Sequence, residues 1–225
     1  MKRQLIALIC SALAVASCGG SSSTPTAPTQ PTTPTAPAQQ NRAPVIGSMS
    51  LTPAFGMMGF TQYSFSATAS DPDGDTLTYA WDVAGNAFSG TSGSIVFSSG
   101  GSGTARVTVS DGTGGSATDT RSFIVGAMSG TWTVTSGQLI GSTFTLTQNT
   151  AGIVTGTFNL PGLGNGQTDP AQPGRIDGNG NLTMRVKLGA FTDFNMVGAM
   201  DNTGRRVSGT LHGSGFTGQP FAMTK

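Results

Sequence analysis

The amino-acid sequence predicts an all-β chain, with a β-sandwich followed by an up-and-down β-barrel of about eight strands. Apolar residues recur at every second position in many short segments from Tyr63 onward, which is the pattern of half-buried strands. Clusters of Gly, Asp and Asn separate these segments, as expected for tight turns. All ten acidic residues are Asp, and Gly occupies 34 positions, so the composition disfavours helices.

The composition also restricts the classes of function. Only 9% of the residues are charged, and the formal net charge is +1, which excludes a nucleic-acid binder that works through a basic face. One His, two Cys and no Glu leave few groups for acid–base, nucleophilic or zinc chemistry. We therefore expect no enzyme.

The N-terminus has the organisation of an export signal. Lys2 and Arg3 precede an apolar run over residues 5–16, which has the length of a signal-peptide core and is too short for a stable membrane span. The small residues VAS then precede Cys18. This order resembles a bacterial lipobox, and an ordinary signal peptide with an incidental Cys is the alternative.

The lipobox resemblance implies a signal peptide at residues 1–17 and a lipid on Cys18. Two or three acyl chains give a stable membrane anchor, because each buried CH₂ contributes about 0.8 kcal/mol. In bacterial lipoproteins an Asp after the lipidated Cys favours the inner membrane, and here the residue is Gly19. The resemblance therefore implies a cell-envelope location, in the outer membrane of a Gram-negative bacterium.

Residues 18–43 combine the predicted lipidated Cys with a linker rich in Pro, Thr and Ser. This composition cannot bury enough apolar surface to form a core. Between residues 25 and 37 a Pro stands at every third position, which matches the three residues per turn of polyproline II. The segment is interpreted as a spacer, or as a linker without a length requirement.

The first predicted β domain covers residues 44–127. Residues 61–70 alternate between apolar and hydroxyl side chains, and the same alternation recurs in residues 77–81, 106–110 and 116–125. Turn sequences separate these strands, namely DPDGD at residues 71–75 and DGTGG at residues 111–115. The pattern is typical of a β-sandwich.

The segments SDPDGDTLTYAWDV and ARVTVSDGTGGSATDTRSFIV resemble PKD-type and related Ig-like sandwich domains of bacteria. The resemblance covers about 80 residues and departs from the PKD pattern after Trp81, where this chain reads DVAG. It implies a PKD/Ig-like fold that serves as a spacer or adhesive module on a surface protein. A few such domains bind calcium.

Calcium is the one cofactor that the residues suggest. Asp71, Asp73 and Asp75 alternate within one turn, and Asp82 follows Asp71 at the offset of the closing acid of an EF-hand. The EF-hand pattern otherwise fails, because its Gly position is Thr76 and the loop runs into a strand. The alternative is that Asp, Pro and Gly simply form a turn.

The second predicted β domain covers residues 128–225. Apolar residues alternate with Thr and other polar residues over about eight strands, enough for a closed barrel without exposed edges. One longer loop is expected over residues 160–173. His212 is out of step with the apolar positions of its strand, so we expect it on the outer face.

Two barrel families resemble this domain. GTW at residues 130–132 is similar to the lipocalin opening, in which the Trp packs near a basic residue of a late strand, here Arg205 or Arg206. GTWTV, QLIGSTFTLT and AGIVTGTF resemble the first three strands of the avidin–streptavidin family over some 30 residues.

That resemblance implies ligand-binding positions at Trp132, Ser142 and Phe158. Ser142 matches the family's serine on the biotin ureido oxygen, but Phe158 replaces its Tyr, and the other Trp residues of the biotin site are missing. We therefore do not expect biotin binding. The barrel interior is either filled by side chains or holds one small cavity.

These features together predict a non-catalytic, lipid-anchored cell-surface protein for structural display or adhesion. Its expected partners are the membrane, through Cys18, and a glycan or protein at the cell surface, with no nucleic acid. The alternative is a lipoprotein that binds a small ligand in the barrel cavity.

Overall fold

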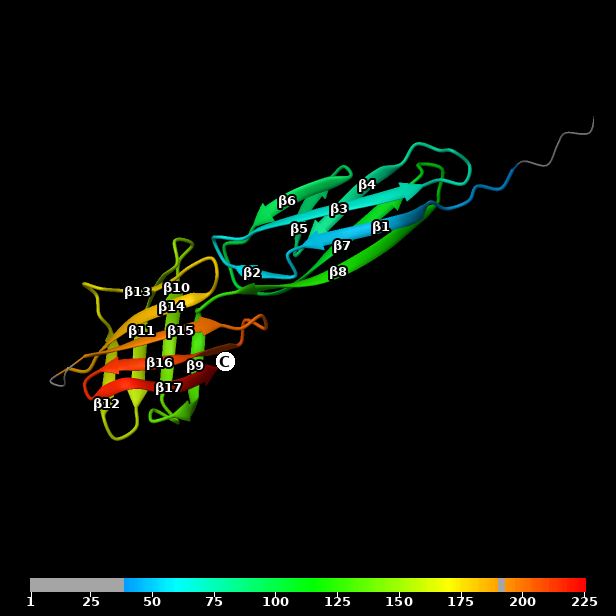
Figure 1. Ribbon diagram of the computed structural model, residues 1–225. Helices are drawn as coiled ribbons and strands as arrows, with labels where there is room; N and C mark the ends of the chain where they lie inside the picture. Colours follow the sequence, from blue (N-terminus) through cyan, green and yellow to red (C-terminus); the bar gives the residue numbers. More distant parts are fainter. Residues whose placement is uncertain (1–38, 190–192) are drawn as a thin grey trace, which may run out of the picture. The chain divides into compact units, whose positions relative to one another are not determined.

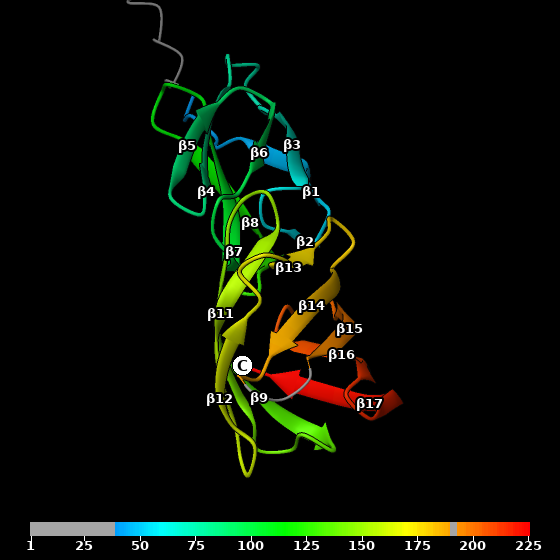
Figure 2. The ribbon, with the colours of Figure 1, turned by 90° about the vertical axis from the view of Figure 1, so that its left-hand side faces the viewer.

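The computed structural model describes residues 39–189 and 193–225, and every regular element in these ranges is a β-strand (Figures 1 and 2). The all-β prediction is therefore confirmed. Residues 40–225 form one compact unit. In the described ranges no helix has the length and hydropathy needed to span a membrane. The signal peptide, Cys18 and most of the linker lie outside the described residues.

The first domain consists of two sheets. One is antiparallel, with the strand order β1-β3-β6, and the other has the order β2-β8-β7-β4-β5, with β2 parallel to β8. The strands are β1 (Val45–Thr52), β2 (Phe55–Met57), β3 (Gln62–Ser70), β4 (Thr78–Val83), β5 (Asn86–Ser89), β6 (Ser92–Val96), β7 (Gly101–Ser110) and β8 (Ser116–Gly126).

The alternation of the sequence positions this sandwich core. On β3 the apolar residues Tyr63, Phe65 and Ala67 are buried, whereas the Ser and Thr residues between them are exposed. The Phe65 ring lies 4.7 Å from that of Trp81 on β4, and Tyr63 donates a hydrogen bond to the carbonyl of Ile124 on β8. The aromatic side chains therefore join the two sheets.

Four strands of the sandwich have weak sequence patterns, and the sequence does not predict them. They are β1, β2, β5 and β6. Their segments are short or rich in Ser and Gly, and β1 carries an irregularity between Ile46 and Ser48 that shifts its alternation. Their strand conformation follows from backbone pairing with β3, β4 and β8, which alternate clearly in the sequence.

The second domain is a closed antiparallel barrel with eight strand positions, as predicted. Figure 2 shows β11 across a common interior from β15 and β16. Pairing of β9 with β17, of β10 with β11, and of β14 with both β12 and β13 closes the sheet. The strands are β9 (Gly130–Gly137), β10 (Thr143–Gln148), β11 (Ile153–Leu160), β12 (Gly164–Thr168), β13 (Gly174–Ile176), β14 (Asn181–Lys187), β15 (Phe194–Met200), β16 (Arg206–Gly213) and β17 (Phe216–Thr224).

The predicted loop over residues 160–173 is wrong in part, because β12 lies within it. Strands β12 and β13 share one position of the barrel, and each pairs with β11 and β14. The segment GNGQT has no apolar alternation, so the sequence does not reveal it. Gly166 is required there, since a Cβ would lie 2.3 Å from the Phe158 ring.

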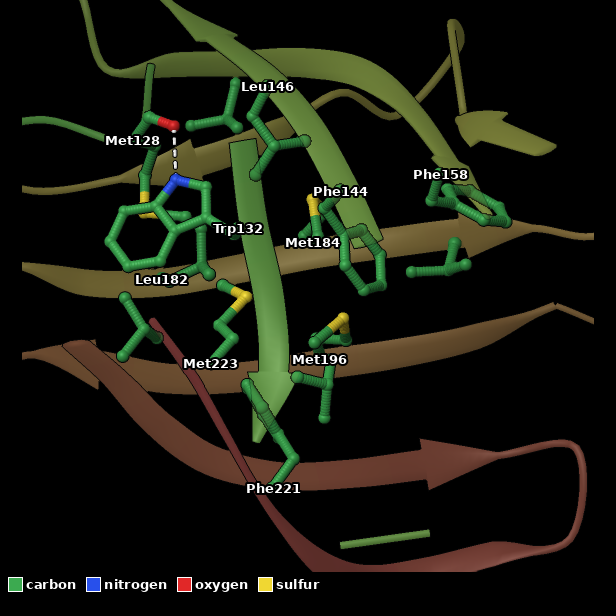
Figure 3. Close-up of a cluster of buried hydrophobic side chains, with 14 of the residues drawn as sticks. Met128, Trp132, Phe144, Leu146, Phe158, Leu182, Met184, Met196, Phe221 and Met223 are labelled. Atoms are coloured by element: carbon green, nitrogen blue, oxygen red, sulfur yellow. Dashed lines mark hydrogen bonds between the residues drawn. The ribbon is translucent and has the colours of Figure 1, made fainter. Parts of the chain in front are cut away.

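The barrel interior is filled by side chains. The ring of Phe144 packs 5.5 Å from that of Phe158, and Met and Leu residues of β14–β17 fill the space around them (Figure 3). The largest side chains of the barrel with under 2% exposure are Trp132, Phe144, Phe194, Met128, Leu146, Leu160, Leu182, Met184, Met196 and Leu211. Of the two alternatives for the interior, the structure shows the filled one.

Candidate functional site

The acidic turn of the sandwich is held by its own backbone. The Asp71 Oδ1 atom accepts hydrogen bonds from the backbone N–H groups of Asp73 and Asp75, at 2.8 and 3.2 Å. Such side-chain-to-backbone bonds are typical of Asx turns. The Asp71 Oδ2 atom is buried and has no hydrogen-bond partner among the described residues.

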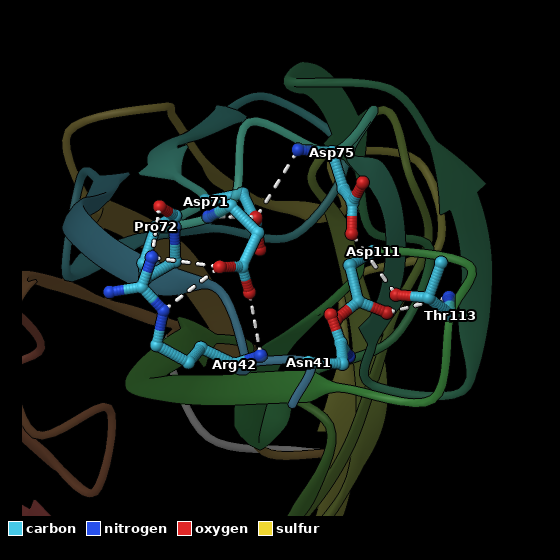
Figure 4. Close-up of polar contacts among 8 residues, drawn as sticks. Asn41, Arg42, Asp71, Pro72, Asp75, Asp111 and Thr113 are labelled. Carbon is cyan, nitrogen blue, oxygen red and sulfur yellow. Dashed lines mark hydrogen bonds and ion pairs between the residues drawn. The ribbon is translucent and has the colours of Figure 1, made fainter. Parts of the chain in front are cut away.

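Two of the other three predicted calcium ligands, Asp73 and Asp82, are engaged elsewhere. Arg42 binds the Asp73 carboxylate through its side chain at 2.7 Å and through its backbone N–H (Figure 4). The Asp82 Oδ1 atom accepts the N–H of Gly85 at 2.7 Å in the next turn. Within residues 39–189 and 193–225, no group of three or more His, Cys, Asp or Glu side chains has a metal-binding arrangement. Calcium binding stays a prediction.

Asp111, which the sequence pattern does not mark as a site residue, accepts several hydrogen bonds at this end of the sandwich. Its oxygens accept hydrogen bonds from the Asn41 amide and from the backbone N–H groups of Thr113 and Gly115, at 2.8 to 3.1 Å. The Thr113 hydroxyl in turn donates to Asp75 (Figure 4). Only 4% of Asp111 is exposed. In the sequence, only the turn pattern DGTGG at residues 111–115 points to Asp111.

These hydrogen bonds lower the pKa of Asp111 to about 2, first through the Asn41 side chain and then through the two backbone N–H groups. A carboxylate whose pKa is lowered in the folded state stabilises the fold at pH values above its pKa in the unfolded chain. This contribution is lost as the pH falls toward its pKa in the folded state. We therefore expect the free energy of unfolding to decrease between about pH 4 and pH 2. Urea titrations at several pH values, followed by Trp fluorescence, measure this decrease.

The matched variant for this prediction is Asp111→Asn, which keeps the shape of the side chain but removes its titration. We expect the variant to lose part of the pH dependence between pH 4 and 2. Asp177→Asn is the comparison variant. It removes another carboxylate with a lowered pKa, which lies in a hydrogen-bonded turn of the barrel. An unchanged slope in Asp111→Asn, relative to the native chain, contradicts the assignment.

The three residues suggested as ligand contacts in the barrel are all buried. Trp132, Ser142 and Phe158 have exposures of 0%, 1% and 4%, and the two aromatic rings belong to the filled core (Figure 3). The structure therefore brings Trp132 and Phe158 into one cluster, but packs them against other side chains.

Trp132 has a basic partner, as the lipocalin resemblance implied, but the residue is Lys225. The Lys225 Nζ atom lies 4.9 Å from the centre of the Trp132 ring and donates to the carbonyl oxygens of Ala127 and Ser129 at 2.7 and 3.2 Å. Burial, with the nearby charge of Arg205, lowers the pKa of Lys225. The expectation of Arg205 or Arg206 over this ring is thus wrong. Lys225 follows β17 directly and contacts the Trp132 ring from a position outside the predicted strands.

The comparison with family sequence patterns decides the identity of the first domain, because residues 41–125 match the PKD domain pattern. Residues 41–125 belong to the PKD domain family. The PKD1 domain of Vibrio anguillarum Epp is 30% identical, over 38% of this chain and 96% of that chain, with a TM-score of 0.32.

A second solved structure with similarity to the chain is a carbohydrate-binding module from the β-sandwich superfamily. It is 16% identical, over 76% of this chain and 61% of that chain, with a TM-score of 0.36. No curated protein matches the chain.

The PKD domain includes the acidic turn, the Asp111 cluster and the Asn41 side chain that binds it. The barrel, from residue 128 onward, lies outside the match.

Proposed function

We propose that this chain is a non-catalytic envelope protein, anchored through a lipid on Cys18, that presents its PKD domain and barrel for contact with a partner at the cell surface. The order of segments supports this proposal. An export-signal pattern and a Pro-rich linker precede the PKD domain, and the barrel follows it.

The observation that carries the proposal is the filling of both interiors by apolar side chains. The sandwich core and the barrel core are separate clusters of buried residues, dominated by aromatic, Val, Leu and Met side chains. His212 lies on the exposed face of β16, as expected from its register. A partner would therefore meet the outer surfaces, which are rich in Ser, Thr and Asn.

The filled barrel weakens the alternative of a small ligand inside it. A ligand pocket needs about 300 Å³ or more with largely apolar walls. The positions suggested for it, Trp132 and Phe158, instead contact other core side chains. We therefore place the binding surface outside the barrel.

Metabolic labelling with palmitate tests the anchor. We expect the full chain, expressed in a Gram-negative host with its own signal, to incorporate the label and to sediment with the outer membrane. The Cys18→Ala variant should carry no label and should leave the membrane fraction. Cys10→Ala is the matched control, because Cys10 lies within the predicted signal peptide and should not affect labelling.

Two results would contradict the anchored-display proposal. One is a native chain without label, and the other is a label that persists in Cys18→Ala. Protease treatment of intact cells adds the surface test, since a displayed PKD domain should be cleaved or shed without cell lysis.

A further inference from the structure

A row of planar polar side chains crosses three neighbouring strands on the outer face of the barrel. Arg185 on β14 is directly opposite Asn195 on β15, and Asn195 is opposite His212 on β16. Directly opposite side chains on one face of a sheet lie about 5 Å apart. The fold thus places a guanidinium, a carboxamide and an imidazole side by side.

These three residues line a groove of about 330 Å³, which we call the β14–β16 groove. The neighbouring row contributes Thr183 and Val197, and Gln172 from the loop before β13 also lines it. Val197 is a large apolar side chain with 43% exposure, and Pro173 also lines the groove. The groove therefore offers hydrogen-bonding groups around an apolar patch.

Arg185 is held in place at one end of the groove. Its Nε and Nη2 atoms contact the Asp193 carboxylate at 3.1 and 3.0 Å, and Asp169, which is buried, lies 3.8 Å from Nε. A guanidinium has five N–H donors, and these contacts engage two of them. The remaining donors have no protein partner in the described part of the chain, and the side chain is about one-third exposed.

Asn195 and His212 add both donors and acceptors. Asn195 is exposed and lines the groove, so its amide oxygen and its NH₂ group can meet a ligand. The His212 Nε2 atom is 2.9 Å from the Thr210 hydroxyl, which fixes the ring. The other ring nitrogen carries the second hydrogen-bonding function of the imidazole.

The charge of the groove argues for a neutral ligand. The two carboxylates next to Arg185 offset its positive charge, so the electrostatic attraction of an anion to the guanidinium is weak. A hydroxyl oxygen can still accept hydrogen bonds from the free N–H groups. A ring that carries hydroxyl groups around its edge and C–H groups on its face matches these donors, acceptors and the exposed Val197.

From this arrangement we propose that the β14–β16 groove binds a neutral pyranose ring of a surface glycan. The proposal rests on the proposed function, since it names the partner that the displayed barrel would contact. Recognition comes from Arg185, Asn195 and His212 through hydrogen bonds to ring hydroxyls, and Val197 contacts the C–H face. A single ring has few atoms, so the expected dissociation constant is about 1 mM.

Ligand-observed NMR tests the proposal on the full chain in a zwitterionic detergent that contains no sugar. The probes are the methyl pyranosides of glucose, galactose, mannose and N-acetylglucosamine, each titrated separately, with glycerol as a non-cyclic polyol. We expect saturation transfer to at least one pyranoside, saturating at millimolar concentration, and none to glycerol.

The variants assign the binding to the groove. Asn195→Leu removes both hydrogen-bonding functions and keeps the branched arrangement of the side-chain heavy atoms, so we expect at least about tenfold weaker binding. Arg185→Lys keeps the charge but loses the guanidinium fork, and should also weaken binding. Asn202→Leu, in an exposed turn of the same barrel outside the groove, is the matched control and should bind as the native chain does.

Two outcomes would overturn the proposal. One is the absence of saturable binding by every pyranoside, and the other is equal binding by native protein and the folded Asn195→Leu variant, checked by its far-ultraviolet circular dichroism. Because the measurement does not depend on lipidation, its failure leaves the Cys18 anchor intact. A failed palmitate experiment, conversely, leaves the groove untouched.

Discussion

Replacement of Trp132 by alanine should lower the free energy of unfolding by about 3–5 kcal/mol, the usual cost of removing a large aromatic side chain from a core. Trp132 has no exposed surface, and its indole Nε1 donates a hydrogen bond to the Met128 carbonyl at 2.8 Å (Figure 3). The variant leaves a cavity and an unpaired carbonyl, and it removes the ring beneath Lys225.

Urea denaturation followed by circular dichroism measures this loss, because the remaining Trp81 reports only on the PKD domain. Ile140→Ala is the matched control, since it also truncates an apolar side chain of the barrel. Ile140 is 64% exposed, and its truncation should change stability by less than about 0.5 kcal/mol. Equal effects of the two substitutions would mean that Trp132 is not part of the barrel core.

Replacement of Gly209 by alanine should cost about 3 kcal/mol, at the upper end of the range for overpacked sites. Gly209 on β16 is directly opposite Gly198 on β15. A Cβ on Gly209 would lie 2.0 Å from the Val197 carbonyl oxygen and 2.4 Å from the Gly198 Cα. These contacts are with backbone, so relief requires the two strands to separate, which breaks ladder hydrogen bonds.

Gly47→Ala is the matched control for this prediction. Gly47 lies in a strand of the PKD domain, and the nearest atom to its added Cβ is the Thr68 Oγ1 at 3.4 Å, an ordinary contact. Its substitution should be nearly neutral, because alanine also reduces the entropy of the unfolded chain. Thermal unfolding of both variants provides the comparison. A Gly209→Ala variant with native stability would show that β15 and β16 do not approach each other so closely.

The sequence predicts the strands that alternate clearly and misses those that depend on their neighbours. On β3 and β14 every second residue is apolar, and burial of these positions reproduces the predicted faces. Strand β12, with the sequence GNGQT, has no such pattern. It is a strand because β11 and β14 offer it backbone partners on both sides.

The candidate sites show the same division. Spacing along the chain grouped Asp71, Asp73 and Asp75 with Asp82, but Asp73 binds Arg42, and Asp82 binds the next turn. Asp111 comes from a turn some 40 residues away and joins Asp75 only through Thr113. A one-dimensional pattern contains no information about such a contact.

The amino-acid order by itself determined the strand class, the two β domains and the outward position of His212, because a period of two requires only local geometry. Tertiary structure alone decided that the barrel interior is filled, that Lys225 covers Trp132, and that Arg185, Asn195 and His212 form one row. Each of these facts depends on strand register, and register is set by packing and backbone pairing between segments distant in the chain.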